Sequence, residues 1–496
     1  MLTPAEELGL SGAAIASRVQ LAFHRLPEPM LADLLERLRE GAIQQHLVYC
    51  RDDGLDEAVR VLPIPITVLP EQQTYIHHVT LTLQNALKRL PELYLADPRI
   101  AETLRLPETE ERWLQECWGT SQSEHNPVFG RLDAVIDYTS PMWKDTLRFV
   151  EPNLSGIGGI HMVPSSERLI LKLVGPMLRR ADQTLRLGLG DDIRDLLTQV
   201  LLEHADAMGT GRGICLVEPK YDGHGPDEQA DLARYLRERH GLTVTHADPA
   251  ELHLRDGRVW HGDVPVDLAY RDYAVADLLD LADEGVDVEP MKLLLRENRM
   301  VSSIAAELDQ KSCWEVLTDP VLAHRYFSPA EQAIFRRHVP WTRVVADRET
   351  TLPEGGTGHL LTHARVAQEQ LVLKPDRGYG GDGILLGPAL SPAEWESAID
   401  RALADEQRWV LQQLVAIPVR EFPVLAPDGR VAMEPFYTVM GFAASDDGLA
   451  VLARASQKQV VNVAQHGGLC AVLLCHSRPE VGLVTAEHPA PRPARA

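Results

Sequence analysis

The spacing of apolar residues changes along the chain, from a helical period in its first part to short strand-like runs in its last part. Apolar residues recur every three or four positions from Met30 to Leu38, and again from Ile76 to Leu90. This spacing places them on one face of a helix. Residues 1–125 are therefore predicted to be mainly helical.

Two strand patterns and a glycine-rich turn follow this helical region. Residues 131–138 and 146–153 are each predicted to form a strand, and Thr139–Pro141 supplies turn residues between them. The run Leu154–Ile160 is rich in glycine, which suits a turn that carries a substrate or an ion, although a plain loop would have the same composition. Helical spacing returns over residues 165–208.

The two predicted strands bring acidic residues together. If the strands pair as a hairpin centred on Met142, Asp133 lies opposite Glu151, and Arg131 lies opposite Asn153. Like charges on directly opposed residues destabilise a hairpin, and a divalent cation between them would reverse that cost. Oxygen ligands from Asp, Glu and Asn suit Mg²⁺ that also holds nucleotide phosphates. The alternative is a solvated hairpin face whose register is shifted by a residue or two.

Short apolar strands alternate with a polar-faced helix over residues 213–272, which is typical of an α/β unit. The expected elements are strands at 214–217, 242–244 and 266–272, a helix at 228–240 and a hairpin turn at 255–258. Arg271, at the end of the last strand, is placed either to clamp a substrate carboxylate or to form a structural ion pair.

A second glycine-dense loop lies late in the chain. An apolar run from Leu371 ends in Lys374, the glycine loop Gly378–Gly383 follows, and residues 384–386 form another apolar run. Glycines let the backbone approach a ligand closely, successive N–H groups can cradle an anion, and a lysine supplies a point charge for phosphate. The alternative is a hairpin with a glycine turn and a surface lysine.

Two familiar phosphate-binding motifs do not fit this loop. In a P-loop the lysine follows the glycines, whereas Lys374 precedes them. A dinucleotide-binding fingerprint opens a helix after its glycines, whereas a short aliphatic run follows here. Strand, flexible loop and strand is therefore the predicted arrangement.

The flanks of this loop carry clear helix starts. Ser328 and Ser391 each open a capping box, with proline at the first helical position. Residues 409–415 read as a strand whose polar break could face an adenine ring. The proline-rich tail from residue 477 is predicted to be disordered.

Composition and charge narrow the classes of function. The 496 residues, a length typical of about three domains, include 49 Lys and Arg against 72 Asp and Glu, giving a formal net charge of −23. This charge argues against a nucleic-acid partner and against docking on anionic lipid, but it leaves room for an anionic substrate in a local basic cleft. No run approaches the ~20 apolar residues of a membrane span.

Cysteine usage and the start of the chain point to the cytoplasm. The first residues are acidic and lack the apolar core of a signal peptide. The six cysteines form no Cys-x-x-Cys pair, so isolated buried thiols are expected rather than a metal or redox site. A reducing, cytoplasmic environment fits this pattern.

Taken in order, these motifs resemble the circularly permuted (type 2) ATP-grasp family, and are similar to the synthetase half of glutathionylspermidine synthase. An ordinary ATP-grasp chain carries its phosphate lysines and glycine loop first. Here Asp133 and the Glu151-Pro152-Asn153 motif come before Lys311 and Lys374, as in the permuted members. The resemblance covers roughly residues 15–475.

The resemblance implies a set of site residues. Gln413 departs from the glutamate that many members carry, and Gln310 stands where a charged residue often precedes the first lysine. The implied roles are catalytic for Arg131 and Arg454; nucleotide-binding for Lys311, Lys374, Gly378, Tyr379, Gly380, Gly381, Gly383, Gln412 and Gln413; Mg²⁺-binding for Asp133, Glu151 and Asn153; and substrate-binding for Ser155, Gly156 and Arg271.

The resemblance also implies an activity and a fold. The activity would be that of an ADP-forming ligase that uses ATP and Mg²⁺ to join a small-molecule carboxylate to an amine, such as an amino acid, peptide or polyamine, through an acyl phosphate. Alternatives are an ATP-grasp protein that binds nucleotide without ligase activity, and a small-molecule phosphotransferase. The fold would be an α/β, circularly permuted ATP-grasp fold with a helical N-terminal region and an inserted α/β substrate domain.

The implied units are 1–125 (helical), 126–210 (the metal-binding hairpin), 211–310 (the substrate domain), 311–476 (the nucleotide-binding part) and 477–496 (the tail).

Overall fold

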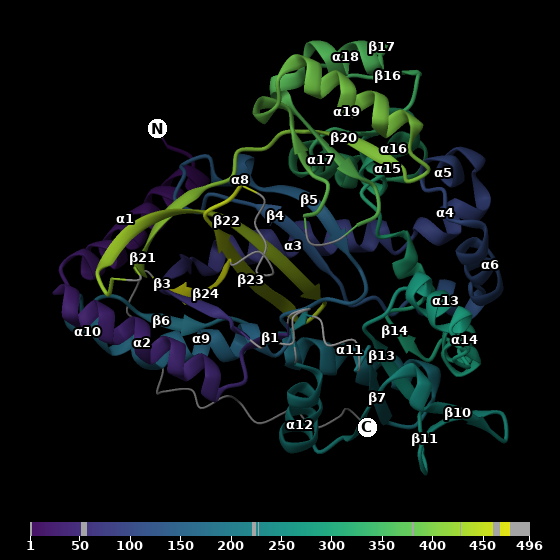
Figure 1. The fold of residues 1–496 in the computed structure, drawn as a ribbon, viewed down its shortest axis with the longest axis horizontal. Coiled ribbons are helices and arrows are strands. Elements are labelled where there is room, and N and C mark those ends of the chain that lie inside the picture. Colours follow the sequence, from purple (N-terminus) through teal and green to yellow (C-terminus); the bar gives the residue numbers. More distant parts are fainter. Residues whose placement is uncertain are drawn as a thin grey trace.

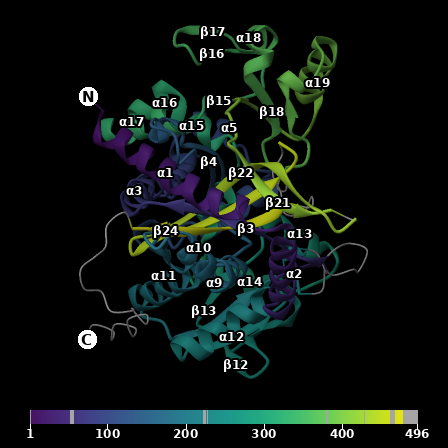
Figure 2. The same ribbon diagram turned by 90° about the vertical axis from the view of Figure 1, so that its left-hand side faces the viewer.

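The computed structural model describes residues 2–50, 57–220, 225–226, 228–378, 381–426, 428–459 and 467–476. A large mixed sheet occupies the middle of the molecule (Figure 1). A small antiparallel sheet with its own helices and a parallel α/β unit lie on opposite sides of this large sheet (Figure 2). The tail predicted to be disordered lies outside the described residues.

The N-terminal region is helical over most of its described length, as the apolar spacing predicts. α1 begins at a capping box formed by Thr3 and Glu6, with Pro4 at its first position. The helices of this region are α1 (Pro4–His24), α2 (Glu28–Gln44), α3 (Pro70–Leu87), α4 (Leu90–Ala96), α5 (Pro98–Thr103), α6 (Glu108–Cys117) and α7 (Thr120–Glu124). A short sheet joins β1 (Val48–Cys50) to β2 (Glu57–Ala58) and to β8 (Gly225–Pro226).

This region also contains a long strand that the helical prediction for residues 1–125 did not include. β3 (Arg60–Val68) lies buried at the end of the large sheet and pairs in parallel with β24 (Gly468–Cys475). Its sequence contains Pro63 and Pro65, which cannot donate to a ladder and argue against a strand in the sheet interior. The edge position resolves the conflict, because β3 has a strand neighbour on one side only in the described sheet.

The large sheet brings together strands from the two ends of the chain. Its order is β3, β24, β23 (Gly448–Ser456), β22 (Val431–Ser445), β4 (Arg131–Val135) and β5 (Arg148–Asn153). β21 (Val419–Leu425) pairs with β22, and β6 (Leu187–Leu189) pairs with β24. Most of the stretch predicted to be helical over 165–208 lies in α9 (Met162–Leu173), α10 (Gly175–Ala181) and α11 (Ile193–Met208), but β6 interrupts it between α10 and α11.

The predicted register of the acidic hairpin is confirmed at its open end. Asp133 pairs with Glu151, and Arg131 pairs with Asn153. A bulge after Asp133 shifts the register by one residue, so Ala134 pairs with Phe149. The shift and the helix α8 (Trp143–Thr146) replace the simple turn that the sequence suggests, and both strands are shorter than predicted.

The α/β unit contains a parallel sheet, as its sequence rhythm predicts. The strand order is β14 (Met300–Val301), β13 (Leu268–Arg271), β7 (Gly213–Val217) and β9 (Thr243–Ala247). The helices and short helical turns around it are α12 (Gln229–His240), η1 (Pro249–Glu251), α13 (Val275–Asp283), α14 (Glu289–Arg296) and η2 (Ile304–Leu308). The predicted turn at 255–258 joins β10 (Leu252–Arg255) to β11 (Arg258–His261), and β12 (Val264–Pro265) extends this small sheet.

The small antiparallel sheet carries Lys374 and is called here the lysine sheet. Its order is β15 (Thr342–Val344), β20 (Trp409–Gln413), β18 (Leu371–Pro375) and β19 (Leu385–Leu386). Leu371, Leu373 and Leu411 pack with Trp395 of α19 (Pro392–Ala404) in a separate apolar cluster. Both predicted capping boxes are confirmed, at α19 and at α17 (Pro329–His338).

Other elements near the lysine sheet are α15 (Cys313–Thr318), α16 (Pro320–Tyr326), β16 (Glu349–Thr351), β17 (Thr357–His359), α18 (Leu360–Val366), η3 (Gln368–Gln370) and η4 (Gly387–Ala389).

The strands do not follow the order of the predicted units. β21 to β24, from the last predicted unit, pair with β3 and β4 from the first two, whereas the lysine sheet stands apart from them. The expected isolated thiols are confirmed for Cys117, Cys215, Cys313, Cys470 and Cys475, which are buried and free. In the part of the chain that is described, no helix is long and apolar enough to cross a bilayer.

Candidate active site

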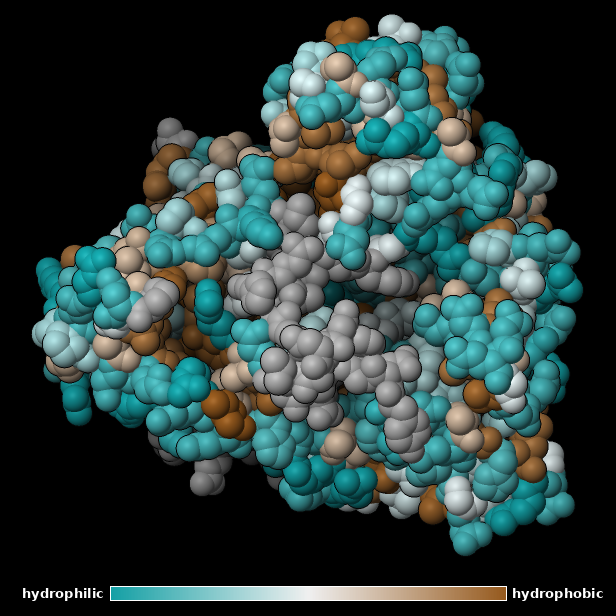
Figure 3. Space-filling model, viewed as in Figure 1, coloured by the Kyte–Doolittle hydropathy of each residue, from teal (hydrophilic) through white to brown (hydrophobic). Residues whose placement is uncertain are grey.

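A cavity of about 270 Å³ lies where the acidic hairpin faces the lysine sheet. Figure 3 shows hydrophobic surface gathered beneath the lobe that carries α18 and α19, at the edge of a hollow. Ten of the residues expected in the site line the cavity: Arg131, Asp133, Glu151, Asn153, Gly156, Lys374, Gly381, Gln412, Gln413 and Arg454. Segments far apart in the sequence thus meet at one place.

Two arginines hold the Asp133 carboxylate. Arg131 Nε lies 2.8 Å from Asp133 Oδ1, and Arg454, reaching from β23, forms an ion pair with Oδ2. Arg131 also donates from Nη1 to the carbonyl oxygen of Gly158, at 2.8 Å. Burial favours the neutral acid, but the two guanidinium charges lower the pKa of Asp133 below its usual value. Asp133 is therefore an anion in the site.

A glycine on the neighbouring strand makes room for the Arg131 side chain. Gly441 of β22 pairs with Asp133, and a Cβ placed on it would lie 2.4 Å from Arg131 Cδ. The glycine therefore leaves the space that the stem of Arg131 occupies. The arginine is 8% exposed, so its neighbours leave it little room to move aside.

Lys311 ties the acidic hairpin to the glycine loop. Its Nζ lies 2.8 Å from Glu151 Oε1 and donates to the carbonyl oxygen of Gly378, also at 2.8 Å. The backbone of the same segment is anchored to the end of β18: Ser312 N donates to Asp376 Oδ1 at 2.7 Å, and Lys311 N donates to the carbonyl oxygen of Asp376 at 3.1 Å. The segment that carries Lys311 is thus bonded directly to the end of the strand that carries Lys374.

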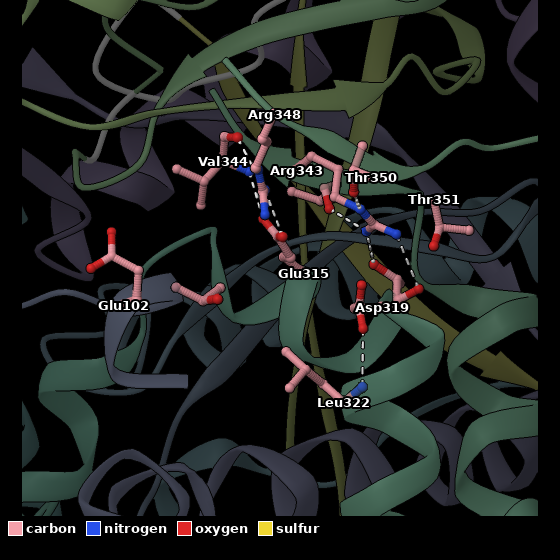
Figure 4. A network of polar contacts seen from close by, with 12 residues as sticks. Glu102, Glu315, Asp319, Leu322, Arg343, Val344, Arg348, Thr350 and Thr351 are labelled. Atoms are coloured by element: carbon pink, nitrogen blue, oxygen red, sulfur yellow. Dashed lines mark hydrogen bonds and ion pairs between the residues drawn. The ribbon is translucent and has the colours of Figure 1, made fainter. Parts of the chain in front are cut away.

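A second set of buried contacts fixes α15, the helix that follows Lys311, against the lysine sheet (Figure 4). The Glu315 carboxylate accepts hydrogen bonds from the backbone N–H of Val344, at 2.6 Å, and from Arg348, at 2.6 and 2.8 Å. Arg343 donates from Nε to Thr350 Oγ1 at 2.9 Å. Glu315 and Arg343 are almost fully buried, so this network keeps the spacing between Lys311 and the sheet.

Lys374 projects from the face of β18 that lines the cavity. Val372, two residues before it, shares this face and pairs with Gln412 of β20. Lys374 Nζ donates to Gln412 Oε1 at 2.8 Å, and Gln412 Nε2 in turn donates to Thr342 Oγ1 at 3.0 Å. Burial lowers the pKa of Lys374 to about 8, with Lys311 acting in the same direction and Glu151 opposing them. The lysine is thus a buried cation whose side chain is bonded to a neutral amide.

The site is cationic although the chain is strongly acidic. Among the described residues that line the cavity, three cations, Arg131, Arg454 and Lys374, stand with two carboxylates, Asp133 and Glu151, which leaves one net positive charge. Lys311 pairs with Glu151 beside the cavity. The formal charge of the whole chain is −23. A surplus of buried positive charge calls for an anionic ligand, because an unpaired charge is costly to bury.

The other residues expected in the glycine loop, the turn and the adenine edge differ in how they are placed. Gly383 has a φ of +71°, which favours glycine, and its position beside Pro375 leaves no room for a Cβ. Ser155 is half-buried in the turn next to Gly156. Tyr379 and Gly380 lie outside the described residues. Gln413 is exposed at the cavity, whereas the Gln412 amide is already bonded to Lys374.

Arg271 takes the second of its two predicted roles, the structural ion pair. It is fully buried, and its Nη1 lies 2.5 Å from Glu307 Oε1. Its guanidinium also donates to the backbone carbonyl oxygens of Ser302, Tyr273 and Ser303, at 2.8 to 2.9 Å. With these partners the guanidinium has no open face for a substrate, so the predicted carboxylate clamp is corrected.

The donor set fits a divalent cation only in part. Among the described residues, no group of three or more His, Cys, Asp or Glu side chains could hold a metal. The Asp133 carboxylate is occupied by two arginines, so the charge repulsion that suggested a cation in the hairpin is already offset. Glu151, whose Oε1 is paired with Lys311, and Asn153 offer the remaining oxygen donors at the cavity, a pair that suits Mg²⁺ completed by phosphate and water.

The sequence analysis missed the apolar walls of the cavity. They are formed by Val135, Val150, Val372, Ile384, Leu386, Leu414, Val415, Ile417 and Val439, with Gln459 at one side. Alternation along β18 could have identified Val372, which is two residues from Lys374. The other walls come from strands whose partners the sequence alone does not reveal.

Comparison with known proteins gives distant relatives only. No protein family matches the chain by its sequence profile. Uncharacterized proteins of Mycobacterium bovis and Mycobacterium tuberculosis are 26% identical over 349 residues, which is 68% of this chain and 58% of each relative. The chain therefore spans less than two thirds of the length of these curated relatives. A Frankia alni protein with the provisional name glutamate–cysteine ligase 2-3 is 38% identical, but only over 55 residues, or 11% of this chain and 6% of its own.

A solved structure shares the fold. A glutathione synthetase-like effector (GSS30) from Globodera pallida, in its apo form, aligns with a TM-score of 0.59 over 91% of this chain and 98% of its own, at 11% identity. The chain therefore shares the α/β fold of this effector. A RimK domain ATP-grasp protein from Sphaerobacter thermophilus aligns over 48% of this chain and 88% of its own, with a TM-score of 0.25, too low to bear on the fold.

The space above Gly441 can be tested by a single methyl group. Gly441→Ala is expected to lower the free energy of unfolding by about 1–3 kcal/mol, because the new Cβ overlaps the buried stem of Arg131. Gly188→Ala, where a Cβ would meet nothing within 4 Å, is the matched control and should have little effect. Chemical denaturation of both variants measures the difference. Equal stability of the two would contradict the packing of Arg131 described above.

Proposed function

We propose that the chain is an ATP-dependent carboxylate–amine ligase of the circularly permuted ATP-grasp type. The observation that carries the proposal is the cavity itself: a buried lysine and two arginines line a space with apolar walls, and a second buried lysine pairs with Glu151 beside it, in a chain that is otherwise acidic. Such a site offers phosphate contacts at one side and an apolar surface for a base at the other. The shared fold of the glutathione synthetase-like effector supports the same reading.

The nucleotide would lie between the lysine sheet and the hairpin. Lys374 and Lys311 would bind the phosphates, replacing Gln412 and the carbonyl oxygen of Gly378 as partners. The adenine would pack against the apolar walls near Val372, with Gln413 at its edge. Tyr379 and Gly380 would complete the glycine loop over the phosphates, which stays a prediction.

Glu151 and Asn153 would hold Mg²⁺. Bound there, the ion would neutralise charge on the phosphate oxygens. Asp133 would act mainly through Arg131 and Arg454, by fixing both guanidinium groups beside the cavity. This differs from the ligand role that the resemblance implies for Asp133.

The proposed reaction has two steps. A carboxylate oxygen of the acid attacks the γ-phosphorus of ATP, the bond to the bridging oxygen breaks, and ADP leaves with the electron pair. The neutral amine nitrogen then attacks the acyl carbon, a C–N bond forms, phosphate leaves with the electron pair as the C–O bond breaks, and the proton that the nitrogen loses passes to the phosphate. Both steps place negative charge on oxygens, which Arg131, Arg454 and the lysines are positioned to stabilise.

The order of the site along the chain supports the permutation. The hairpin residues Asp133 to Asn153 precede Lys311 and Lys374 in sequence, yet they face them in space. β22 and β23 return from the C-terminal part to pair beside β4, which brings Arg454 to Asp133. The sheet thus joins both ends of the described chain around the cavity.

The ligase proposal predicts ATP- and acid-dependent capture of an acyl phosphate. The purified chain would be incubated with ATP, Mg²⁺ and a panel of amino acids, peptides and other carboxylates, with hydroxylamine as a small nucleophile. ADP release and hydroxamate formation should both appear with the correct acid. Lys374→Ala should abolish both, whereas Lys172→Ala, a lysine of α9 that does not line the cavity, should leave them intact.

ADP release without hydroxamate and without dependence on an amine would instead favour a phosphotransferase. Nucleotide binding with no turnover across the whole panel would favour a binding protein. Either result would contradict the ligase.

Nucleotide binding is also expected to be coupled to a proton. In the free protein Lys374 loses its proton near pH 8, well below an ordinary lysine. A polyphosphate beside it would raise that pKa, so binding near pH 8 should take up roughly half a proton. Affinity for ATP should accordingly fall as the pH rises above 8.

Calorimetry in two buffers of different ionisation enthalpy measures the proton uptake directly. Lys374→Met should lose the uptake while any residual binding persists. An unchanged proton count in this variant would place the titrating group elsewhere and overturn the assignment of Lys374.

A further inference from the structure

The parallel sheet of the α/β unit has a switch point that the proposed function does not yet use. From β7 the chain places β9 on one side and β13 on the other, so the order reverses between β7 and β13. In open parallel sheets, ligands bind beyond the carboxyl ends of the strands at such a point. Glu218 follows β7 there and Asp272 follows β13, and their strands are joined by a hydrogen bond from Asp272 N to the carbonyl oxygen of Val217 at 2.7 Å.

The carboxyl ends of β7 and β13, called here the switch-point end, lie next to a residue that lines the cavity of the candidate active site. Gly156 lines that cavity, and a Cβ placed on it would lie 2.7 Å from Asp272 Oδ1. Gly156 therefore lies between the cavity and the Asp272 carboxylate, and it has no side chain that would cover the carboxylate. A group bound to Asp272 would lie next to the turn that carries Gly158, the backbone partner of Arg131.

Two side chains at the switch-point end, Asp272 and Gln229, have acceptor oxygens with few donors among the described residues. Asp272 Oδ2 accepts one bond, at 3.3 Å, from Gln229 Nε2. Gln229 is 2% exposed, and its other amide atom, Oε1, has no hydrogen-bond partner among the described residues. A buried acceptor without a donor is costly, and here it sits on the same amide that touches a carboxylate. The pair therefore calls for a group that donates more than one hydrogen bond.

The other charged groups nearby are already paired. The Glu228 carboxylate accepts hydrogen bonds at 2.5 to 3.3 Å from the backbone N–H groups of Gly159, Ile160, His161 and Met162. Arg271 turns to Glu307 instead of Asp272. In the part of the chain that the structure describes, the side-chain partner of Asp272 is thus the neutral amide of Gln229.

The charges around Asp272 also favour a cation beside it. Glu218, whose charge acts on Asp272 at the switch-point end, is itself paired with His246. Burial, followed by the charges of Glu218 and Glu228, raises the pKa of Asp272 to about 7. A bound cation would lower it again, because an opposite charge favours the carboxylate.

We infer that Asp272 and the carbonyl oxygen of Gln229 bind the ammonium group of the amine substrate. An ammonium carries three N–H donors and one positive charge, which matches a carboxylate oxygen and an unpaired amide oxygen side by side. That the bound ammonium belongs to a substrate rests on the proposed ligase activity. That a cation binds here rests on the contacts of Asp272 and Gln229 alone. It narrows the amine to compounds that are cationic at neutral pH, and it adds no covalent step to the reaction.

Binding of simple ammonium compounds to the full-length chain tests this site without catalysis. Glycinamide, putrescine and spermidine would be titrated calorimetrically at a pH above 7, where Asp272 is ionised. The neutral alcohol 1,4-butanediol is the ligand control. Asp272→Asn keeps the shape of the side chain and removes its charge. Asp263→Asn makes the same charge change at a fully exposed side chain of the same unit.

At least one of the three ammonium compounds should bind the wild-type chain and Asp263→Asn with equal affinity. Its binding to Asp272→Asn should be weaker by roughly tenfold or more, as expected for the loss of a charged hydrogen bond. The diol should not bind. Thermal unfolding of both variants confirms that they are folded.

Equal affinity for Asp272→Asn, equal binding of the diol, or no binding by any of the three compounds would overturn the site. The proposed ligase can fail separately. Ammonium binding that depends on Asp272, without any acid-dependent release of ADP, would keep the cation site and reject the ligase.

Discussion

The ion pair between Lys311 and Glu151 is the contact on which the arrangement of the site depends. It joins the acidic hairpin of the large sheet to the segment that leads into the lysine sheet, at 2.8 Å. The same lysine holds the backbone of the glycine loop at Gly378. Because Lys311 is 5% exposed, losing Glu151 would leave the buried ammonium without its carboxylate, which is strongly destabilising. The hairpin and the sheet are thereby held facing each other.

The charges around this pair differ in how well they are satisfied. Asp133 has two guanidinium partners, and Glu151 has Lys311. Lys374 is bonded to the neutral amide of Gln412, and burial lowers its pKa to about 8. On the far side of Gly156, Asp272 is the converse case, a carboxylate beside an amide. Lys374 is thus a cation, and Asp272 an anion, whose side-chain hydrogen-bond partner is a neutral amide. This arrangement suits the two oppositely charged reactants of the proposed ligase.

Local patterns in the sequence were enough for most of the elements and for part of the site. The alternation in residues 131–153 predicts the pairing of Asp133 with Glu151, and the capping boxes at Ser328 and Ser391 mark two helix starts correctly. The strand β3 escaped because its prolines are tolerated only at a sheet edge, and edges are a property of the whole fold.

The same limit applies to the partners of the charged groups. Arg271 pairs with Glu307, and Arg454 reaches Asp133 across a sheet assembled from distant segments.

The central claim is that the hairpin and the lysine sheet bind one triphosphate between them. A crystal structure with a non-hydrolysable ATP analogue and Mn²⁺ tests it most directly, because the anomalous signal of manganese locates the ion independently of the fitted atoms. The account predicts the ion in contact with Glu151 and Asn153, and the β- and γ-phosphates against Lys311 and Lys374. A nucleotide bound elsewhere, or an ion beyond coordinating distance of Glu151 while the phosphates contact Lys374, would contradict it.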